Sequence, residues 1–212
     1  MNGVRKLHFY LVLAASVSAL ATDMIVPSLP VIQTQLKVSY SLIQLTISGF
    51  LIVYAISQLA YGFIGEKAGK SRTLFVSFAV FATGSLICYF AQDIYFLLFG
   101  RVVQAIGAGA GPVLSRAIAK ETFSANKLKA ALSDISAASA VVPLIAPLLG
   151  GVLLGWFNWN VIFLVMFIFG IVTLFLTPAE NVSKQSNQNQ QQSFITREFI
   201  TGTILVSLML GS

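Results

Sequence analysis

Charged residues are scarce in this 212-residue chain, which is 9% charged and 57% hydrophobic. Soluble domains carry about 25% charged residues, so this composition excludes a water-soluble globular protein. The one cysteine, Cys88, cannot form an intrachain disulfide, and the one histidine, His8, excludes a multi-histidine zinc motif within this chain. We therefore expect no metal site and no cofactor. The net charge of +6 does not indicate nucleic-acid binding, because the cations are scattered over alternate loops.

Long hydrophobic runs are what the sequence has instead. A helix of roughly 20 residues, rising about 1.5 Å per residue, crosses the hydrocarbon of a bilayer. Runs of suitable length cover residues 7–26, 42–63, 73–91, 94–119, 130–155 and 161–176. We therefore predict an all-α, polytopic membrane protein with a six-helix bundle in residues 1–178. Residues 179–197, rich in Asn, Gln and Ser, are predicted to form a cytoplasmic linker, and residues 198–212 the start of a truncated seventh helix.

The cations lie almost entirely on one side of the predicted bundle. If the N-terminus is cytoplasmic, the outer segments hold only Lys37. The inner segments then hold Arg5, Lys6, Lys67, Lys70, Arg72, Arg116, Lys120, Lys127, Lys129, Lys184 and Arg197. Cytoplasmic loops of membrane proteins carry an excess of Lys and Arg. We therefore predict a multi-pass protein of the cell's inner (plasma) membrane with a cytoplasmic N-terminus.

A short basic segment, residues 62–72, separates the second and third hydrophobic runs. We interpret it as a cytoplasmic turn in which glycines let the backbone reverse. Its pattern is carried by Gly62, Glu66, Lys67, Gly69, Lys70 and Arg72. The segment resembles the loop between helices 2 and 3 of the major facilitator superfamily, with Glu66 in place of the usual aspartate and the second base displaced to Arg72. The resemblance implies a gating loop; the alternative is a generic positive-inside loop.

Asp23 lies deep in the first hydrophobic run. A carboxylate inside a membrane helix costs about 2.5 to 3.5 kcal/mol on an insertion scale, so it should face the bundle interior or a wet cavity. The alternative is that Asp23 sits at the outer membrane boundary. The segment resembles the first helix of Bcr/CflA-type drug/proton antiporters, whose pattern is matched by Asp23, Met24, Pro27 and Pro30. The resemblance implies that Asp23 takes up and releases the coupled proton.

Arg101, in the fourth hydrophobic run, is the second candidate for proton coupling. A depth estimate at about 1.5 Å per residue places it at about the level of Asp23, so the two side chains are predicted to pair or to share a proton relay. The alternative is a structural or snorkelling cation. Arg101, Gln104 and Gly107 resemble the facilitator motif of helix 4. Gly107, Gly109 and Gly111 predict a small-residue surface on which other helices pack closely.

The fifth run contains Pro147, Gly150 and Gly151, which resemble a helix 5 motif associated with antiporters among facilitators. The resemblance implies a helix that helps to seal the cavity against ion leak. The alternative is an ordinary packing helix bent by proline. Tyr54, an aromatic residue of the second run, is a further candidate for contact with substrate.

The resemblance as a whole implies the N-terminal half of a major facilitator transporter of the Bcr/CflA drug-resistance group. The implied activity is proton-coupled multidrug efflux by alternating access, an antiporter function that confers antibiotic resistance. Its partners are the lipid bilayer, a small amphipathic substrate, protons and the missing C-terminal half. A membrane enzyme is not predicted, because no nucleophile–base pair or metal cluster lies at membrane depth. The other reading is a non-transporting remnant or interaction partner that is inactive alone.

Overall fold

The hydrophobic runs fold into helices because lipid offers no partners to backbone N–H and C=O groups, which must bond within their own segment. A computed structural model describes residues 2–178, and every regular element in that range is helical. These elements are α1 (Asn2–Asp23), the 3-10 helix η1 (Val26–Ser28), α2 (Leu29–Leu36), α3 (Tyr40–Ala68), α4 (Lys70–Tyr89), α5 (Ile94–Ala108), α6 (Ala110–Thr122), α7 (Ala125–Trp156) and α8 (Asn160–Phe175). The predicted linker at 179–197 and the predicted helix start at 198–212 lie outside the described residues.

Within residues 2–178, five helical segments are long and apolar enough to cross a membrane. They are Gly3–Leu36, Tyr40–Ala68, Lys70–Tyr89, Ile94–Thr122 and Ala125–Trp156. The remaining apolar helix, α8, has 16 residues, a length of about 24 Å at 1.5 Å per residue. The predicted all-α, polytopic architecture is confirmed, whereas the sixth crossing stays a prediction.

The predicted turn at residues 62–72 is wrong in its extent. Helix α3 continues to Ala68 and α4 begins at Lys70, so Gly62 and Glu66 are helical residues. The reversal takes place at Gly69 alone, whose φ of 89° is a conformation that side-chain-bearing residues rarely adopt. The helices run on because the ends of a helix can leave the hydrocarbon and still satisfy their backbone hydrogen bonds internally.

The other connections are also shorter than the sequence indicates. Residues 27–41, between the first two hydrophobic runs, contain α2, and Lys37 directly after α2 is in the left-handed conformation. The connection within the gap between the fourth and fifth runs, residues 120–129, is only two residues long, because α6 ends at Thr122 and α7 begins at Ala125. Two helices, α3 and α5, begin with a polar side chain placed over their free N–H groups. In α5, the Asp93 carboxylate accepts from the Phe96 N–H at 2.9 Å.

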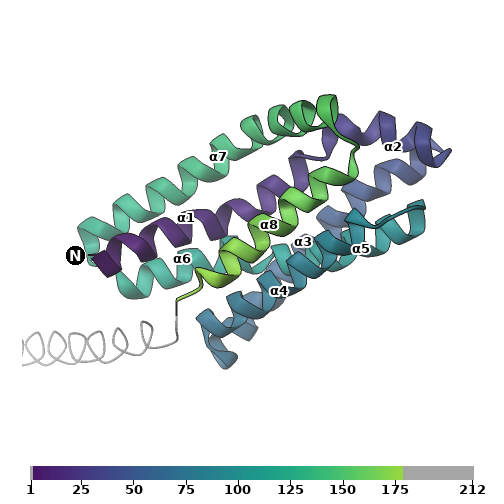
Figure 1. The fold of residues 1–212 in the computed structure, drawn as a ribbon. Coiled ribbons are helices and arrows are strands. Elements are labelled where there is room, and N and C mark those ends of the chain that lie inside the picture. Colours follow the sequence, from purple (N-terminus) through teal and green to yellow (C-terminus); the bar gives the residue numbers. More distant parts are fainter. Residues whose placement is uncertain (1, 179–212) are drawn as a thin grey trace, which may run out of the picture.

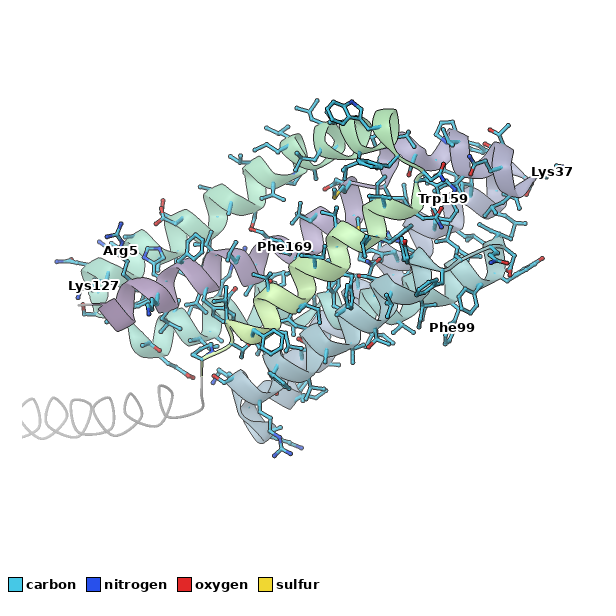
Figure 2. The ribbon with its side chains drawn as sticks, viewed as in Figure 1. Arg5, Lys37, Phe99, Lys127, Trp159 and Phe169 are labelled. Atoms are coloured by element: carbon cyan, nitrogen blue, oxygen red, sulfur yellow. The ribbon has the colours of Figure 1, made fainter. Side chains whose placement is uncertain are left out.

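The helices lie lengthwise beside one another (Figure 1). Helix α1 packs against α6 and α7, while α4 packs against α5 and α8, and α3 packs against α5. Figure 2 shows Arg5 and Lys127 at one end of the bundle and Lys37 at the other. We call the end that carries Arg5 and Lys127 the cationic end. Because the long helices alternate in direction, α1 and α7 start there and α3 and α6 finish there.

Helices α5 and α6 follow one another in the segment Ile94–Thr122, which we call the α5–α6 rod. Three of its glycines bring three different helices close to it, as the small-residue pattern predicted. A Cβ on Gly107 would collide with the backbone nitrogen of Phe81 in α4. One on Gly109 would collide with the Ser57 hydroxyl in α3, and one on Gly111 with the Ala14 carbonyl in α1. The α5–α6 rod is therefore the element around which the helices of the bundle are assembled.

Large apolar side chains remain exposed on the outer faces of α3 and α7. In α3 they include Ile52, Ile56, Leu59 and Phe63, and in α7 they include Leu144, Leu148, Val152 and Trp156. Rows of exposed large apolar side chains of this kind are unusual on soluble monomers. These faces are suited to lipid or to another apolar protein surface.

Candidate transport cavity

A cavity of about 310 Å³ opens between four of the long helices, α1, α3, α6 and α7. Its lining residues are Ala15, Ser18, Ala19, Thr22, Asp23, Tyr54, Gln58, Pro112, Arg116, Ser139 and Pro143. Most of these side chains are polar or small, in contrast to the apolar outer faces of α3 and α7. A volume of several hundred Å³ is in the range of small-molecule pockets. The cavity is therefore a candidate site for a small polar or amphipathic ligand.

Asp23 lines this cavity at the point where α1 ends and the chain passes into η1. The regular helix stops there because Pro27, inside η1, has no N–H with which to continue the α-helical ladder. Within residues 2–178 no cation lies within 4 Å of the Asp23 carboxylate, since the ion pairs in that range are His8–Asp134 and Lys70–Glu121. Asp23 thus presents an unpaired carboxyl group to the cavity.

Arg101 is buried, with 1% of its surface exposed, and is hydrogen-bonded to two other helices and to a residue of its own helix, α5. Its Nε donates to the Thr46 carbonyl of α3 at 3.1 Å. Its Nη1 donates to the Ala21 carbonyl of α1 at 2.9 Å and to the Gln104 amide oxygen at 2.6 Å. The guanidinium carbon lies 4.0 Å from the centre of the Phe50 ring, a cation–π distance.

The predicted Asp23–Arg101 pair is therefore not present in this structure. The depth estimate was correct, because the guanidinium reaches Ala21, two residues before Asp23. What the estimate missed is that backbone carbonyls can satisfy a guanidinium as well as a carboxylate can. The Arg101 side chain is buried against α1 and α3 and does not line the cavity with Asp23. Only part of its hydrogen-bonding capacity is used.

The other two residues of the helix 4 motif hold α5 against α4. The Gln104 amide accepts from Arg101 and donates from its Nε2 to the Ser85 hydroxyl at 2.7 Å. Gly107 gives α4 its close approach. Together the three motif residues form a polar tie between α1, α3, α4 and α5 inside an apolar core.

The residues expected to form a gating loop lie at the cationic end, away from the cavity lining. A Cβ added to Gly62 would meet no atom within 4 Å, so nothing packs against this glycine. The Lys70 ammonium pairs with the Glu121 carboxylate at the end of α6, at 2.5 Å. This pair joins α4 to α6 across the bundle. Glu66, Lys67 and Arg72 have no ion-pair partner within residues 2–178.

The helix 5 motif divides between two environments. A side chain on Gly150 would collide with the Met24 carbonyl, so this glycine lets α7 pack against the end of α1, next to Asp23. Gly151 meets only open space. Pro147 and Pro143 both lie inside α7, which continues through them, and Pro143 lines the cavity.

Tyr54 lines the cavity together with Asp23, as a substrate-contact residue would. It stacks on Phe50 at a centroid distance of 6.0 Å, and Phe50 in turn carries the Arg101 guanidinium. Sequence reasoning missed five polar lining residues, Ser18, Thr22, Gln58, Arg116 and Ser139. The sequence analysis placed Arg116 among the cations of the inner segments. Only its position around the α6 helix relative to the packing glycines could have indicated that it faces the cavity.

No cluster of three or more His, Cys, Asp or Glu side chains suited to a metal ion occurs within residues 2–178. The chemistry on offer in the cavity is therefore that of a carboxyl group, a guanidinium and neutral hydrogen-bonding groups.

A bundle of helices long and apolar enough to cross a membrane, with a polar cavity between α1, α3, α6 and α7, is typical of polytopic membrane proteins that bind small solutes. Comparison with known sequences gives the family: the model of the Major Facilitator Superfamily matches residues 11–212. The chain belongs to the Major Facilitator Superfamily, a family of transporters.

Curated relatives agree with this assignment. The chain is 36% identical over 172 residues to the uncharacterized MFS-type transporter YdgK of Bacillus subtilis (strain 168), covering 80% of this chain and 43% of that protein. It is 27% identical over 163 residues to multidrug resistance protein D of Escherichia coli (strain K12), covering 77% and 41% of the two chains. The chain thus spans about half the length of the curated relatives that it matches.

Solved structures share the fold. The xylose transporter XylE from E. coli, in an inward open conformation, matches with a TM-score of 0.72 at 15% sequence identity. The match covers 98% of this chain and 60% of that one. At this identity the likeness shows the fold alone.

Proposed function

We propose that residues 1–178 are the N-terminal six-helix half of a proton-coupled exporter of small amphipathic molecules. The observation that carries the proposal is the unpaired carboxyl group of Asp23 on a polar cavity between α1, α3, α6 and α7. Ionisable side chains inside membrane segments mark substrate and proton pathways, because they are too costly to keep there without a use. Similarity to a protein named for multidrug resistance supports drugs as the cargo.

The mechanism that we propose is alternating access. The half described here would rock against a second half, so that the cavity lined by α1, α3, α6 and α7 opens to one side of the membrane at a time. Asp23 would bind a proton on one side and release it on the other. Arg101 would act as its electrostatic partner from behind α1, and its hydrogen bond to Ala21 would transmit a shift of the Asp23 segment to α3 and α5.

The segment 62–72 and the helix 5 motif would then open or close the bundle around Asp23. The segment from Gly62 to Arg72 would gate the cationic end, where the Lys70–Glu121 pair joins α4 to α6. In α7, the close contact at Gly150 would seal the bundle beside Asp23. The excess of cations at the end that holds Arg5 and Lys127 supports a cytoplasmic N-terminus in the bacterial inner membrane.

The test is Asp23→Asn in inside-out membrane vesicles that contain the full gene product. We expect uptake of a small amphipathic fluorescent dye driven by a pH gradient to be lost, while the amount of protein inserted in the membrane stays the same. Asp93→Asn is the matched control, because Asp93 is a helix cap that Asn can replace and it lies away from the cavity. Unchanged gradient-driven uptake by the Asp23→Asn variant would remove this carboxyl group from the mechanism.

A further inference from the structure

Arg116 is the cation of the cavity, and it is held there by its own helix. Its Nη1 donates to the Pro112 carbonyl at 3.1 Å, one turn back along α6. Side chains on a helix lean toward its N-terminus, and this bond fixes the guanidinium at the level of Pro112 rather than at the cationic end. Arg116 and Pro112 both line the cavity. The side chain therefore turns away from the cytoplasmic end that its sequence position suggests.

This guanidinium has no counter-ion among the side chains that the structure describes. The ion pairs within residues 2–178 are His8–Asp134 and Lys70–Glu121, and neither involves Arg116. A guanidinium carries five N–H donors, and the bond to Pro112 uses one of them. The neighbouring lining residues Gln58 and Ser139 are neutral. Arg116 thus offers a cavity ligand several charge-assisted donors.

Asp23 is too far along the cavity to neutralise Arg116. Gly111 touches Ala14, which sets the level of Pro112 close to Ala15. Asp23 lies eight residues beyond Ala15 on α1, or about 12 Å at 1.5 Å per residue. No ion pair joins the two side chains. The cavity is therefore bipolar, with a carboxyl group at one end and an unpaired guanidinium about two helical turns further along.

We propose that Arg116 is the anion-recognition residue of this cavity and that the cargo carries an acidic oxygen group, such as a carboxylate, phosphate or phenolate, on an amphipathic body. Guanidinium groups bind such groups through short, often bidentate, hydrogen bonds. The apolar rings and alkyl groups of Tyr54, Ala19 and Pro143 would contact the body of the cargo. The cargo assignment rests on the proposed transport function, whereas anion binding at Arg116 does not.

The test compares two fluorescent probes that differ by one charge, dansylglycine and its methyl ester. Binding to the purified full gene product in detergent is measured by fluorescence anisotropy. We expect Arg116→Gln to weaken binding of the acid about tenfold, the loss of one charge-assisted hydrogen bond. Binding of the ester should change less than about twofold. Arg116→Lys, which keeps the charge but not the planar fork, should fall between the wild type and Arg116→Gln.

Lys120→Gln is the matched control, because Lys120 is an exposed cation one turn further along the same helix, α6, and does not line the cavity. It should leave the affinities for both probes unchanged. Equal loss of acid and ester binding in Arg116→Gln would show a packing role and overturn the proposal. An equal effect of Lys120→Gln would overturn it too, since general surface charge would then explain the preference.

A competition measurement on the wild type keeps the proposal testable if Arg116→Gln does not fold. Benzoate should displace dansylglycine, whereas its neutral analogue benzamide should not; equal displacement by the two contradicts anion recognition.

An anionic lipid headgroup offers the same chemistry as an acidic cargo. If phosphatidylglycerol binds in an Arg116-dependent way and dansylglycine does not, the site holds a lipid and the cargo assignment is wrong. Loss of transport in Asp23→Asn with acid binding retained separates the proton mechanism from anion recognition.

Discussion

Replacing Arg101 by Ala should destabilise the bundle more than any other single change of a charged residue. The change removes the hydrogen bonds that join α5 to α1 and to α3, the bond to Gln104 within α5, and the cation over Phe50. Side-chain hydrogen bonds inside membrane proteins average about 0.6 kcal/mol each, which gives about 2 kcal/mol for the set. Leaving a cavity and unsatisfied buried carbonyls raises the expected loss to about 5 kcal/mol at most.

The assay is the free energy of unfolding in mixed micelles, followed by far-UV circular dichroism as the fraction of SDS is raised. Arg101→Lys should recover only part of the loss, because one ammonium group cannot reach acceptors on two other helices at once. Lys120→Ala, at an exposed site on the same rod, should change the free energy by less than about 0.5 kcal/mol. If Arg101→Ala costs less than about 1 kcal/mol, Arg101 is not the tie between the helices that the structure indicates.

Three further changes test the packing of the bundle. Gly107→Leu should lower the free energy of unfolding by about 3 kcal/mol or more in the same SDS titration, because its side chain collides with the backbone of α4. Gly151→Leu faces open space and should be nearly neutral. Similar losses for the two variants would contradict the close approach of α4. Reversing the charge of Lys70 or Glu121 alone should lower the free energy of unfolding by about 1 kcal/mol, and exchanging the two residues should restore most of the loss. A double variant that recovers nothing would contradict the ion pair. The Trp159 indole N–H donates to the Gln35 amide oxygen at 2.8 Å. Trp159→Phe removes this bond and should lower the midpoint of thermal unfolding, with a loss of about 1 kcal/mol; an unchanged midpoint would show that the bond is not formed.

The helices could be predicted from the sequence because hydropathy reports directly on contact with lipid. Their ends could not, because hydropathy marks where the hydrocarbon stops and not where the helix stops. Gly62 and Glu66 illustrate the difference, since α3 carries them past the apolar run as regular helix until Gly69. Similarly, the segment 28–41 is polar enough to resemble a loop, yet α2 occupies most of its length.

The candidate site was only partly predictable, for a related reason. The cost of placing a carboxylate in lipid led to Asp23, which the structure finds on the cavity. The partners of Arg101 were missed, because backbone carbonyls such as those of Ala21 and Thr46 leave no mark in a sequence. Arg116 was missed because a cation near a helix end matches the positive-inside pattern whichever way its side chain turns.

Whether position 23 is accessible to water decides whether the proposed transport cavity exists. In a Cys88→Ala background, a single cysteine is placed at Asp23 or at Phe99, an exposed apolar position of α5 on the outside of the bundle (Figure 2). Intact membranes are then treated with a membrane-impermeant, water-soluble maleimide. We predict labelling at position 23 and little or none at position 99, because only the first faces a polar cavity. Labelling at position 99 with none at position 23 would mean that Asp23 does not face water, which would contradict the proposed transport cavity.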